Sequence, residues 1–431
     1  MSEGGWGAAL VLSLRDRAKL PQSVALRSGG SRWPPHPDGT HMHGKAGTWL
    51  LNIGHAIDHM FLLIFATAVT SIAADFGLAR WEDLMPWGTL AFFLFGIGSL
   101  PAGRLGDLWG RRPMMIVFFV GIGVSAVLVS LARSPFEIAV TLGLLGAFAA
   151  IYHPVGIPML VRGSPRPGWT LGVNGLAGNL GVALAAVVTG FLVKHLGWRA
   201  AFAIPGLFAV GCGIAFALLV RDDGPAPARR RPQQAEVPQG MFLRLFLVMT
   251  LAATSGSLLF NFSTNGNYEL LRERLAAVTA APATLGLLLA LVYAAASVAQ
   301  LVVGRLIDRF PLKPLYLAVI AVQIPLLALA AFADRWWLYA LQLLFMIAIF
   351  GAIPFTEAMI VRYVDDSMRS RVAGMRLTVS FGASSAAVWL LGPLVREAGF
   401  SALLLLMAAI ACCTLFTVAW LPPAPGQDKA G

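Results

Sequence analysis

Charged side chains are scarce in this chain of 431 residues: Asp, Glu, Lys and Arg make up only 12%, against about 25% in soluble domains. Hydrophobic residues account for 58%, and the mean hydropathy is +0.74. A soluble fold of this length has too little interior to hide so much apolar surface. Most of the chain is therefore expected to lie in lipid.

Cysteine is also scarce. The three cysteines, Cys212, Cys412 and Cys413, lie in apolar segments, and their spacing matches neither a disulfide framework nor a zinc site. The complete Gly-x-x-x-x-Gly-Lys-Ser/Thr loop that holds nucleotide phosphates is absent from the sequence. We therefore expect no ATP-driven step, no enzyme activity and no cofactor.

Long apolar segments are abundant. A helix needs about 20 apolar residues to cross a bilayer, and an open chain in lipid must satisfy its own backbone hydrogen bonds, which favours helices. The sequence thus predicts an all-α membrane protein with twelve transmembrane helices at 47–73, 84–105, 113–132, 136–161, 169–194, 199–220, 241–265, 282–305, 313–333, 336–361, 371–395 and 400–421.

These segments fall into two groups of six. Residues 46–220 are expected to form one helical bundle and residues 241–421 a second. Residues 221–240, rich in arginine and proline, are interpreted as a polar linker. Residues 1–45 are expected to be a disordered tail because proline and arginine are scattered through them, and residues 422–431 a short C-terminal tail.

Two pairs of phrases repeat at nearly the same offset. The segment Gly103–Arg112 follows one apolar segment and precedes another, and a partly matching copy lies at Gly304–Lys313. Pro154–Arg162 and Pro354–Arg362 form the second pair. Two matches at nearly one offset indicate an internal two-fold repeat, as in many transporters.

The net charge of +11 does not indicate a nucleic-acid partner, because the arginines are scattered near the ends of the apolar segments rather than gathered in one track. Connections after the second, fourth, sixth, eighth and tenth segments carry more Lys and Arg than the others. The positive-inside rule then predicts that both termini are cytoplasmic. We expect a monomer in a bacterial-type inner membrane.

The first repeated phrase resembles the signature Gly-x-Leu-x-Asp-x-x-Gly-Arg-Arg of the major facilitator superfamily, through Gly103, Leu105, Asp107, Gly110, Arg111 and Arg112. Gly197-Trp198-Arg199 followed by Phe202 resembles the family's usual entry to its sixth helix. The resemblance covers about 46–421. It implies two pseudo-symmetric six-helix bundles around a central cavity that opens alternately to either side.

A narrower resemblance is to exporters of the fosmidomycin-resistance type. It is carried by Gly54-His55 before Asp58, by Tyr152-His153-Pro154 and by Gly178-Asn179-Leu180-Gly181. This likeness implies proton-driven export of a small compound. Many drug–proton antiporters carry a Gly-Pro pair in the fifth helix, whereas this chain has glycines at 172, 175, 178 and 181 without that proline. The direction of transport therefore stays open.

Four polar residues of the expected helix 47–73 share one face. Asn52, His55, Asp58 and His59 are spaced three or four apart, and ionisable groups inside a membrane persist when they face a polar cavity. We interpret Asp58, His55 and His59 as a proton-coupling site; simple anchoring of the helix is the alternative. The two histidines also resemble a metal pair, but no third ligand is evident, so no metal is expected.

Residues expected to contact a substrate are those with polar side chains inside apolar segments: Asn52, Tyr152, His153, Asn174, Asn179, Asn261 and Arg376. Pro154 is expected to loosen the helix beside His153, because proline removes a backbone donor; a plain kink is the alternative. The amides and hydroxyls of 241–265 predict a partly unwound helix. Asn267 and Glu269 are expected in the loop that follows it.

Conformational gating is assigned to the two charged phrases and to one further acid, namely Gly103, Asp107, Gly110, Arg111, Arg112, Asp308 and Glu357. Glu357 is expected to pair with Arg362 or Arg376, or to sit at the membrane interface. The function that these features favour is proton-coupled transport of a small organic solute by alternating access, with export favoured. The alternatives are uptake of a small organic anion, or a transporter-shaped sensor or membrane enzyme that uses His55, Asp58 and His59.

Overall fold

The computed structural model describes residues 44–162, 164, 167–221, 239–363 and 366–421. The predicted tails and linker fall almost wholly outside these ranges. At their edges, residues 44–45 and 239–240 are already helical, so the first and seventh helices begin slightly earlier than the composition predicted.

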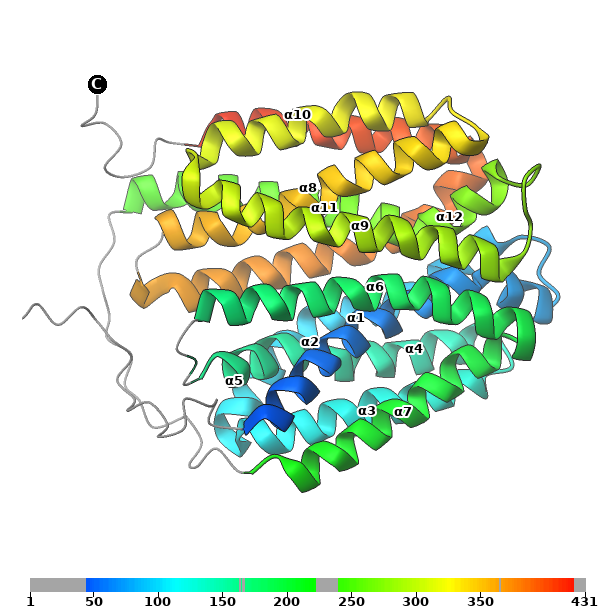
Figure 1. The fold of residues 1–431 in the computed structure, drawn as a ribbon, viewed down its shortest axis with the longest axis horizontal. Coiled ribbons are helices and arrows are strands. Elements are labelled where there is room, and N and C mark those ends of the chain that lie inside the picture. The colour runs from blue at the N-terminus through cyan, green and yellow to red at the C-terminus, as the bar shows by residue number, and fades with distance from the viewer. Residues whose placement is uncertain (1–43, 163, 165–166, 222–238, 364–365, 422–431) are drawn as a thin grey trace, which may run out of the picture.

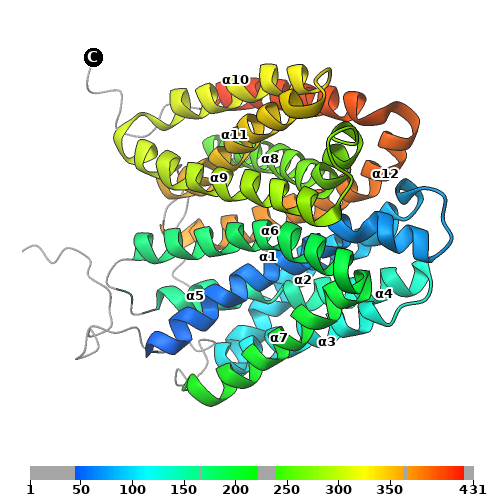
Figure 2. The same cartoon turned by 45° about the vertical axis from the view of Figure 1, so that its right-hand side comes forward.

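The described residues form two helical halves that lie side by side (Figures 1 and 2). The first half holds α1 Gly44–Asp75, α2 Thr89–Trp109, α3 Arg111–Ser130, α4 Pro135–Ala149, α5 Ile157–Val161, α6 Pro167–Leu196 and α7 Trp198–Leu219. The second half holds α8 Gln239–Arg274, α9 Pro282–Arg309, α10 Leu312–Ala330, α11 Arg335–Tyr363 and α12 Asp366–Ala419. Short 3-10 turns, η2 Trp81–Asp83 and η3 Met85–Gly88, precede α2, and a π-helical turn, η4 Tyr152–Gly156, follows α4.

In the described part of the chain, 11 helices are long and apolar enough to cross a membrane. The last of these spans, Met375–Ala419, has 45 residues, about twice the length that one crossing needs. Gly399 interrupts it with a φ of 76°, a conformation that glycine adopts without a steric cost. Two crossings therefore share α12, which agrees with the predicted twelve-helix arrangement.

The phrase Gly103–Arg112 is mostly helical, so the second helix continues past its predicted end at residue 105. α2 runs to Trp109, so Asp107 lies on its last turns. Only Gly110, with a φ of 100°, breaks the helix before α3 begins at Arg111. α2 continues through the charged residues because a helix that leaves the apolar layer can keep its backbone hydrogen bonds while its charged side chains reach water.

α8 also corrects a prediction. It is continuous from Gln239 to Arg274 rather than partly unwound, and Asn267 and Glu269 are buried within it instead of lying in a loop. The polar side chains do not unwind the helix because several of them donate to backbone carbonyls one turn back. The hydroxyl of Ser263 donates to the carbonyl of Leu259, and that of Thr264 to the carbonyl of Phe260. The side-chain amide of Asn265 donates to the carbonyl of Asn261.

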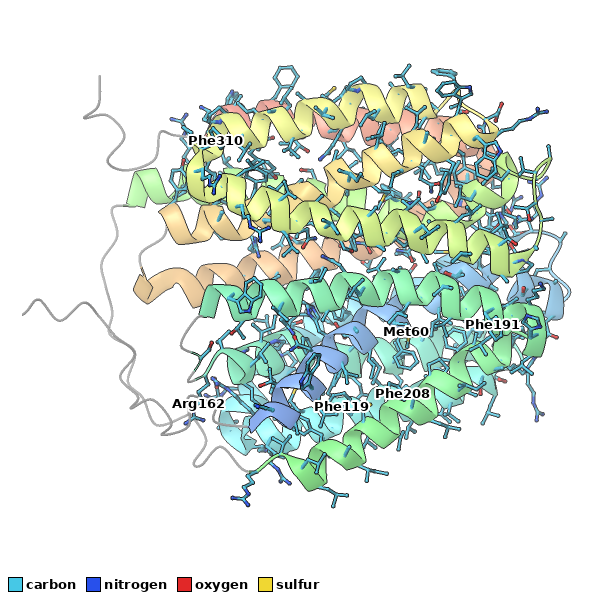
Figure 3. All side chains as sticks on the ribbon, in the orientation of Figure 1. Met60, Phe119, Arg162, Phe191, Phe208 and Phe310 are labelled. Carbon is cyan, nitrogen blue, oxygen red and sulfur yellow. The ribbon has the colours of Figure 1, made fainter. Side chains whose placement is uncertain are left out.

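The bundle has two ends, shown in Figure 3, where Arg162 and Phe310 lie at one end and Phe191 lies toward the other. We call the first the motif end, because it carries the break at Gly110, and the second the far end, which carries Gly197.

Glycines let the two halves meet closely between α6 and α9. A Cβ atom on Gly286 would stand 2.4 Å from the carbonyl oxygen of Ala186, and one on Gly190 would stand 2.6 Å from that of Pro282. Small residues permit this backbone approach between membrane helices. The close approach at Gly190 and Gly286 lies at the far end.

Candidate functional site

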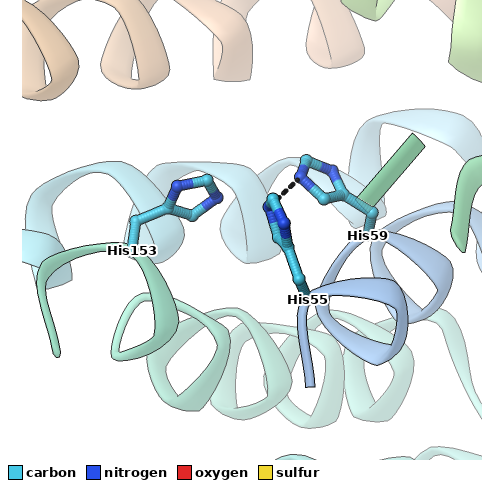
Figure 4. Close-up of side chains that lie close together, drawn as sticks. All are labelled: His55, His59 and His153. Atoms are coloured by element: carbon cyan, nitrogen blue, oxygen red, sulfur yellow. Dashed lines mark hydrogen bonds between the residues drawn. The ribbon is translucent and has the colours of Figure 1, made fainter. Parts of the chain in front are cut away.

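Three histidines meet inside the first half, although they come from distant parts of the sequence (Figure 4). His55 and His59 stand one turn apart on α1, and His153 lies on the π-helical turn η4. Pro154 accounts for this turn because it has no N–H to continue the α-helical ladder, and π-turns frequently occur at functional sites. The predicted irregularity at Pro154 is confirmed.

Hydrogen bonds determine the tautomer of the His55 ring. Its Nδ1 lies 2.7 Å from the backbone carbonyl oxygen of Asn174, which can only accept, so Nδ1 carries the proton. In the neutral ring, Nε2 is then an acceptor. Nε2 of His59, 3.2 Å away, donates to it. The two imidazoles form a directed chain in which His59 donates to His55 and His55 donates to the Asn174 carbonyl.

A buried polar frame holds this chain in place. The Tyr152 ring stacks on His55 with centroids 4.7 Å apart, and its hydroxyl donates to the carbonyl of Leu51 at 2.8 Å. The Asn174 amide donates to the Tyr152 hydroxyl at 2.7 Å and to Asn52 Oδ1 at 3.1 Å. Asn52, Tyr152 and Asn174, all predicted to contact substrate, thus lie in one network with His55.

Gly178 allows α6 to come this close to α1. A Cβ atom there would stand 2.6 Å from the His55 ring, and one on Gly181 would stand 2.2 Å from the carbonyl oxygen of Ala56. Gly178 and Gly181 therefore form the surface on which α1 packs, whereas a Cβ on Gly172 or Gly175 meets no described atom within 4 Å.

Replacing Tyr152 with Phe is expected to loosen this frame. The variant loses the bond to Leu51 and leaves the Asn174 amide short of a partner, which costs about 1–3 kcal/mol of unfolding free energy. Thermal unfolding in detergent measures the effect. Tyr339→Phe is the control, since its hydroxyl makes a bond to Leu288 within the other half. Equal midpoints for Tyr152→Phe and the unaltered protein would show that the frame contributes nothing.

Asp58 lies beside the histidines and is fully buried. Neither carboxyl oxygen has a hydrogen-bond partner among the described residues. The nearest charged or chargeable contact is His153 Nε2, 3.6 Å from Oδ2, which is too long for a hydrogen bond. An isolated buried carboxylate is costly, so this group is stable only when protonated or newly paired.

The three histidines offer nitrogen ligands within 4.8 Å of one another. From the sequence, His55 and His59 lacked a third ligand, because nothing in the spacing indicated that residue 153 returns to α1. The π-turn brings it there.

Three other predicted substrate residues lie outside this network. Asn179 is buried on α6, while Asn261 donates to the Ser257 carbonyl of its own helix at 2.9 Å. Arg376 is buried on α12, in the second half. Of the predicted gating residues, the side chains of Asp308 and Glu357 fall outside the described part of the structure.

The motif end of the first half is tied together by its arginines. Arg112 donates to the carbonyls of Ala217 and Val220, both at 2.6 Å, and so caps the end of α7. Arg111 donates to the Pro158 carbonyl at 3.1 Å. On Gly103, a Cβ would meet that of Pro154 at 3.3 Å. The repeated phrase therefore contacts the segment that carries His153, while its gating role stays a prediction.

Polar contacts also join the two halves at the far end, and the sequence did not predict them. Thr70 of α1 donates to Glu269 of α8 at 2.6 Å, and Arg272 completes the pairing of this buried acid. Arg396 and Asp83 form a second link at 2.6 Å. The one local signal was the three-residue spacing of Glu269 and Arg272, which is typical of a helical ion pair.

Thr70→Val is expected to weaken the far-end contact. The substitution keeps the shape but removes a hydrogen bond to a buried charged group, worth about 1.5–3 kcal/mol. The midpoint of thermal unfolding should fall. Thr67→Val, one turn earlier, is a matched control because, among the described residues, its hydroxyl bonds the Leu63 carbonyl of the same helix. An equal effect of both variants would contradict a link between the halves.

Comparison with known proteins agrees with this architecture. The sequence profile of the Major Facilitator Superfamily matches residues 51–268 and 241–431. The chain belongs to the Major Facilitator Superfamily. Its twelve-helix fold and its membership of a transporter family rather than an enzyme family follow, and the small-molecule substrate and the surrounding bilayer are features of that superfamily.

Two curated relatives are similar over part of their length. The probable actinorhodin transporter of Streptomyces coelicolor is 30% identical over 247 residues, covering 54% of this chain. The tetracenomycin C resistance and export protein of Streptomyces glaucescens is 29% identical over 205 residues, covering 47%. The matches span only 42% and 38% of those two proteins.

A solved structure of the nucleoside transporter NupG has the same fold, with a TM-score of 0.69 at 13% identity. The alignment covers 87% of this chain and 99% of that one.

Proposed function

We propose that the chain is a proton-coupled secondary transporter that exports a small organic solute across a bacterial inner membrane, with both termini in the cytoplasm. The observation that carries the proposal is Asp58: a fully buried carboxyl group with no described hydrogen-bond partner, beside three imidazoles. Carboxyl and imidazole groups are the side chains that membrane transporters use to take up and release protons.

The position of Asp58 supports coupling to a conformational change. It lies on α1 about 18 Å from Thr70, at 1.5 Å per helical residue, and Thr70 contacts the other half at the far end. When Asp58 is ionised, α1 needs a polar or positively charged partner; when it is protonated, α1 tolerates apolar packing. A proton thereby changes the relative stability of two arrangements of α1, which is what coupling requires.

The proposed direction rests on the relative from Streptomyces glaucescens, whose name states resistance and export. The proposed orientation rests on the excess of arginine and lysine at the motif end. In this orientation the far-end contacts of Thr70 and Gly286 face the outside, so the structure corresponds to a state closed to the outside.

Transport in proteoliposomes tests the proposal. The purified protein is reconstituted, a pH gradient is imposed, and uptake of a panel of radiolabelled organic solutes is followed together with internal pH. We expect solute movement against its gradient, opposite in direction to the protons. Movement with the protons would replace export by uptake, and accumulation that is indifferent to the pH gradient would contradict proton coupling.

A further inference from the structure

We propose that His55, His59 and His153 form a binding site for a divalent transition-metal ion, with Zn²⁺ the best match. This is a ligand beyond the organic solute and the proton of the proposed function. It does not depend on either, because it follows from the positions of the three rings.

The spacing of the first two nitrogens fits tetrahedral coordination. Two nitrogen ligands about 2.0–2.1 Å from a tetrahedral ion stand about 3.3–3.4 Å apart. Nε2 of His55 and Nε2 of His59 are 3.2 Å apart, and all three ligand nitrogens lie within 4.8 Å of one another. A small movement of the His153 ring completes three corners of a tetrahedron. Figure 4 shows the three rings turned toward a shared space.

His55 is held as metal-bound histidines usually are. A metal-ligating histidine typically donates its other ring N–H to a carboxylate or a backbone carbonyl, which fixes the tautomer and the ring orientation. His55 makes this bond from Nδ1 to the Asn174 carbonyl at 2.7 Å, so the electron pair of its Nε2, which accepts from His59, can bind an ion once the His59 proton moves from Nε2 to Nδ1. Stacking on Tyr152 keeps the ring from rotating.

Asp58 provides the second observation that indicates a cation. Its carboxyl group is fully buried, lacks a described hydrogen-bond partner and lies 3.6 Å from His153 Nε2. A doubly charged ion in an apolar interior needs a negative group close by. Asp58 meets this need and lies near enough to the ring of His153 to support that ligand or to take the fourth position.

The chemistry of the ligands selects the ion. Imidazole nitrogens suit Zn²⁺, Cu²⁺ and Ni²⁺, whereas Mg²⁺ and Ca²⁺ require sets of oxygen ligands. Phe95 and Phe381 lie edge-on to His153, with centroids 6.0 and 5.9 Å from its ring, and give the site an apolar wall. The His153 side chain is 17% exposed, while its Nε2 is buried within the cluster.

Binding of Co²⁺, a visible substitute for Zn²⁺, tests the site directly. Full-length protein is purified in detergent, its affinity tag is removed, it is stripped with chelator, and it is titrated at one fixed pH. We expect saturable d–d absorption bands of tetrahedral Co²⁺ that Zn²⁺ abolishes and that excess Mg²⁺ leaves unchanged. Absence of these bands in the unaltered, folded protein would overturn the proposal.

Variants locate the ion. His59→Asn and His153→Asn should each weaken binding at least about 100-fold, while His195→Asn, an exposed histidine at the far end of α6, should bind as the unaltered protein does. Unchanged binding in both cluster variants would place the ion elsewhere and overturn the proposal.

If those variants do not fold, X-ray absorption of the Zn²⁺-loaded unaltered protein decides the matter, with three nitrogen ligands expected at about 2.0–2.1 Å. A ligand set without three nitrogens would overturn the site. Because every readout is binding, failure here leaves the test of proton-coupled flux intact.

Discussion

Proteoliposomes that contain the Asp58→Asn variant are expected to accumulate no solute when a pH gradient is imposed. One pH unit supplies about 1.4 kcal/mol per proton, enough for about tenfold accumulation by the unaltered protein. Asparagine keeps the size of the side chain but cannot take up or release a proton, so the ratio should fall to about one. Exchange of solute between equal concentrations should persist, since the amide does not block the path.

Asp334→Asn is the matched control for this experiment. Asp334 pairs with Arg274 at the far end and is largely exposed, so its charge plays no part in the buried cluster and its variant should accumulate solute normally. Tenfold accumulation by Asp58→Asn would remove Asp58 from the coupling mechanism. The proton would then have to be carried by the histidines or by a group in the second half.

Gly286→Ala is expected to open the far end. The added Cβ would stand 2.4 Å from the Ala186 carbonyl oxygen, whereas carbon and oxygen normally stay about 3.3 Å apart or more. The position of a Cβ is set by its backbone and the oxygen belongs to the backbone, so neither atom can rotate away and the two halves must separate locally. Overpacking of this kind costs about 1–3 kcal/mol, which corresponds to a shift of roughly 5–150-fold between two conformations.

Distances between spin labels measure this shift. With the native cysteines replaced by serine, Lys194→Cys and Val278→Cys place one label on each half at the far end, where both side chains are exposed. Gly286→Ala should lengthen the distance. Gly211→Ala is the control, because a Cβ there meets no described atom within 4 Å. Identical distance distributions in the two variants would show that the α6–α9 contact does not hold the far end closed.

The histidine cluster shows where prediction from sequence stopped. His55, Asp58 and His59 were found because one helix places them on one face, and local spacing is enough to show this. His153 was singled out separately, through Pro154. That it contacts the other two depends on the π-turn at η4 and on the packing of α1 against Gly178, which no pattern within one segment reveals.

The far-end contacts show the same limit, because the sequence did not predict them. Glu269 was predicted to lie in a loop, because an acid near the end of an apolar segment usually marks the membrane surface. It is instead buried within α8, since Thr70 and Arg272 satisfy its oxygens. Asp83 and Arg396 carried no signal at all, because residues from the two halves meet only when the halves are packed together.

The sequence by itself determined that lipid surrounds this protein, that its backbone is helical and that its two halves repeat. These properties follow from composition, segment length and the need of each helix to satisfy its own hydrogen bonds. Only the tertiary structure decided that three histidines and a buried carboxyl group share one site, and that the two halves meet closely at the far end. Those facts depend on how closely helices approach one another, and glycines such as Gly178 and Gly286 set that approach through neighbours that are distant in the sequence.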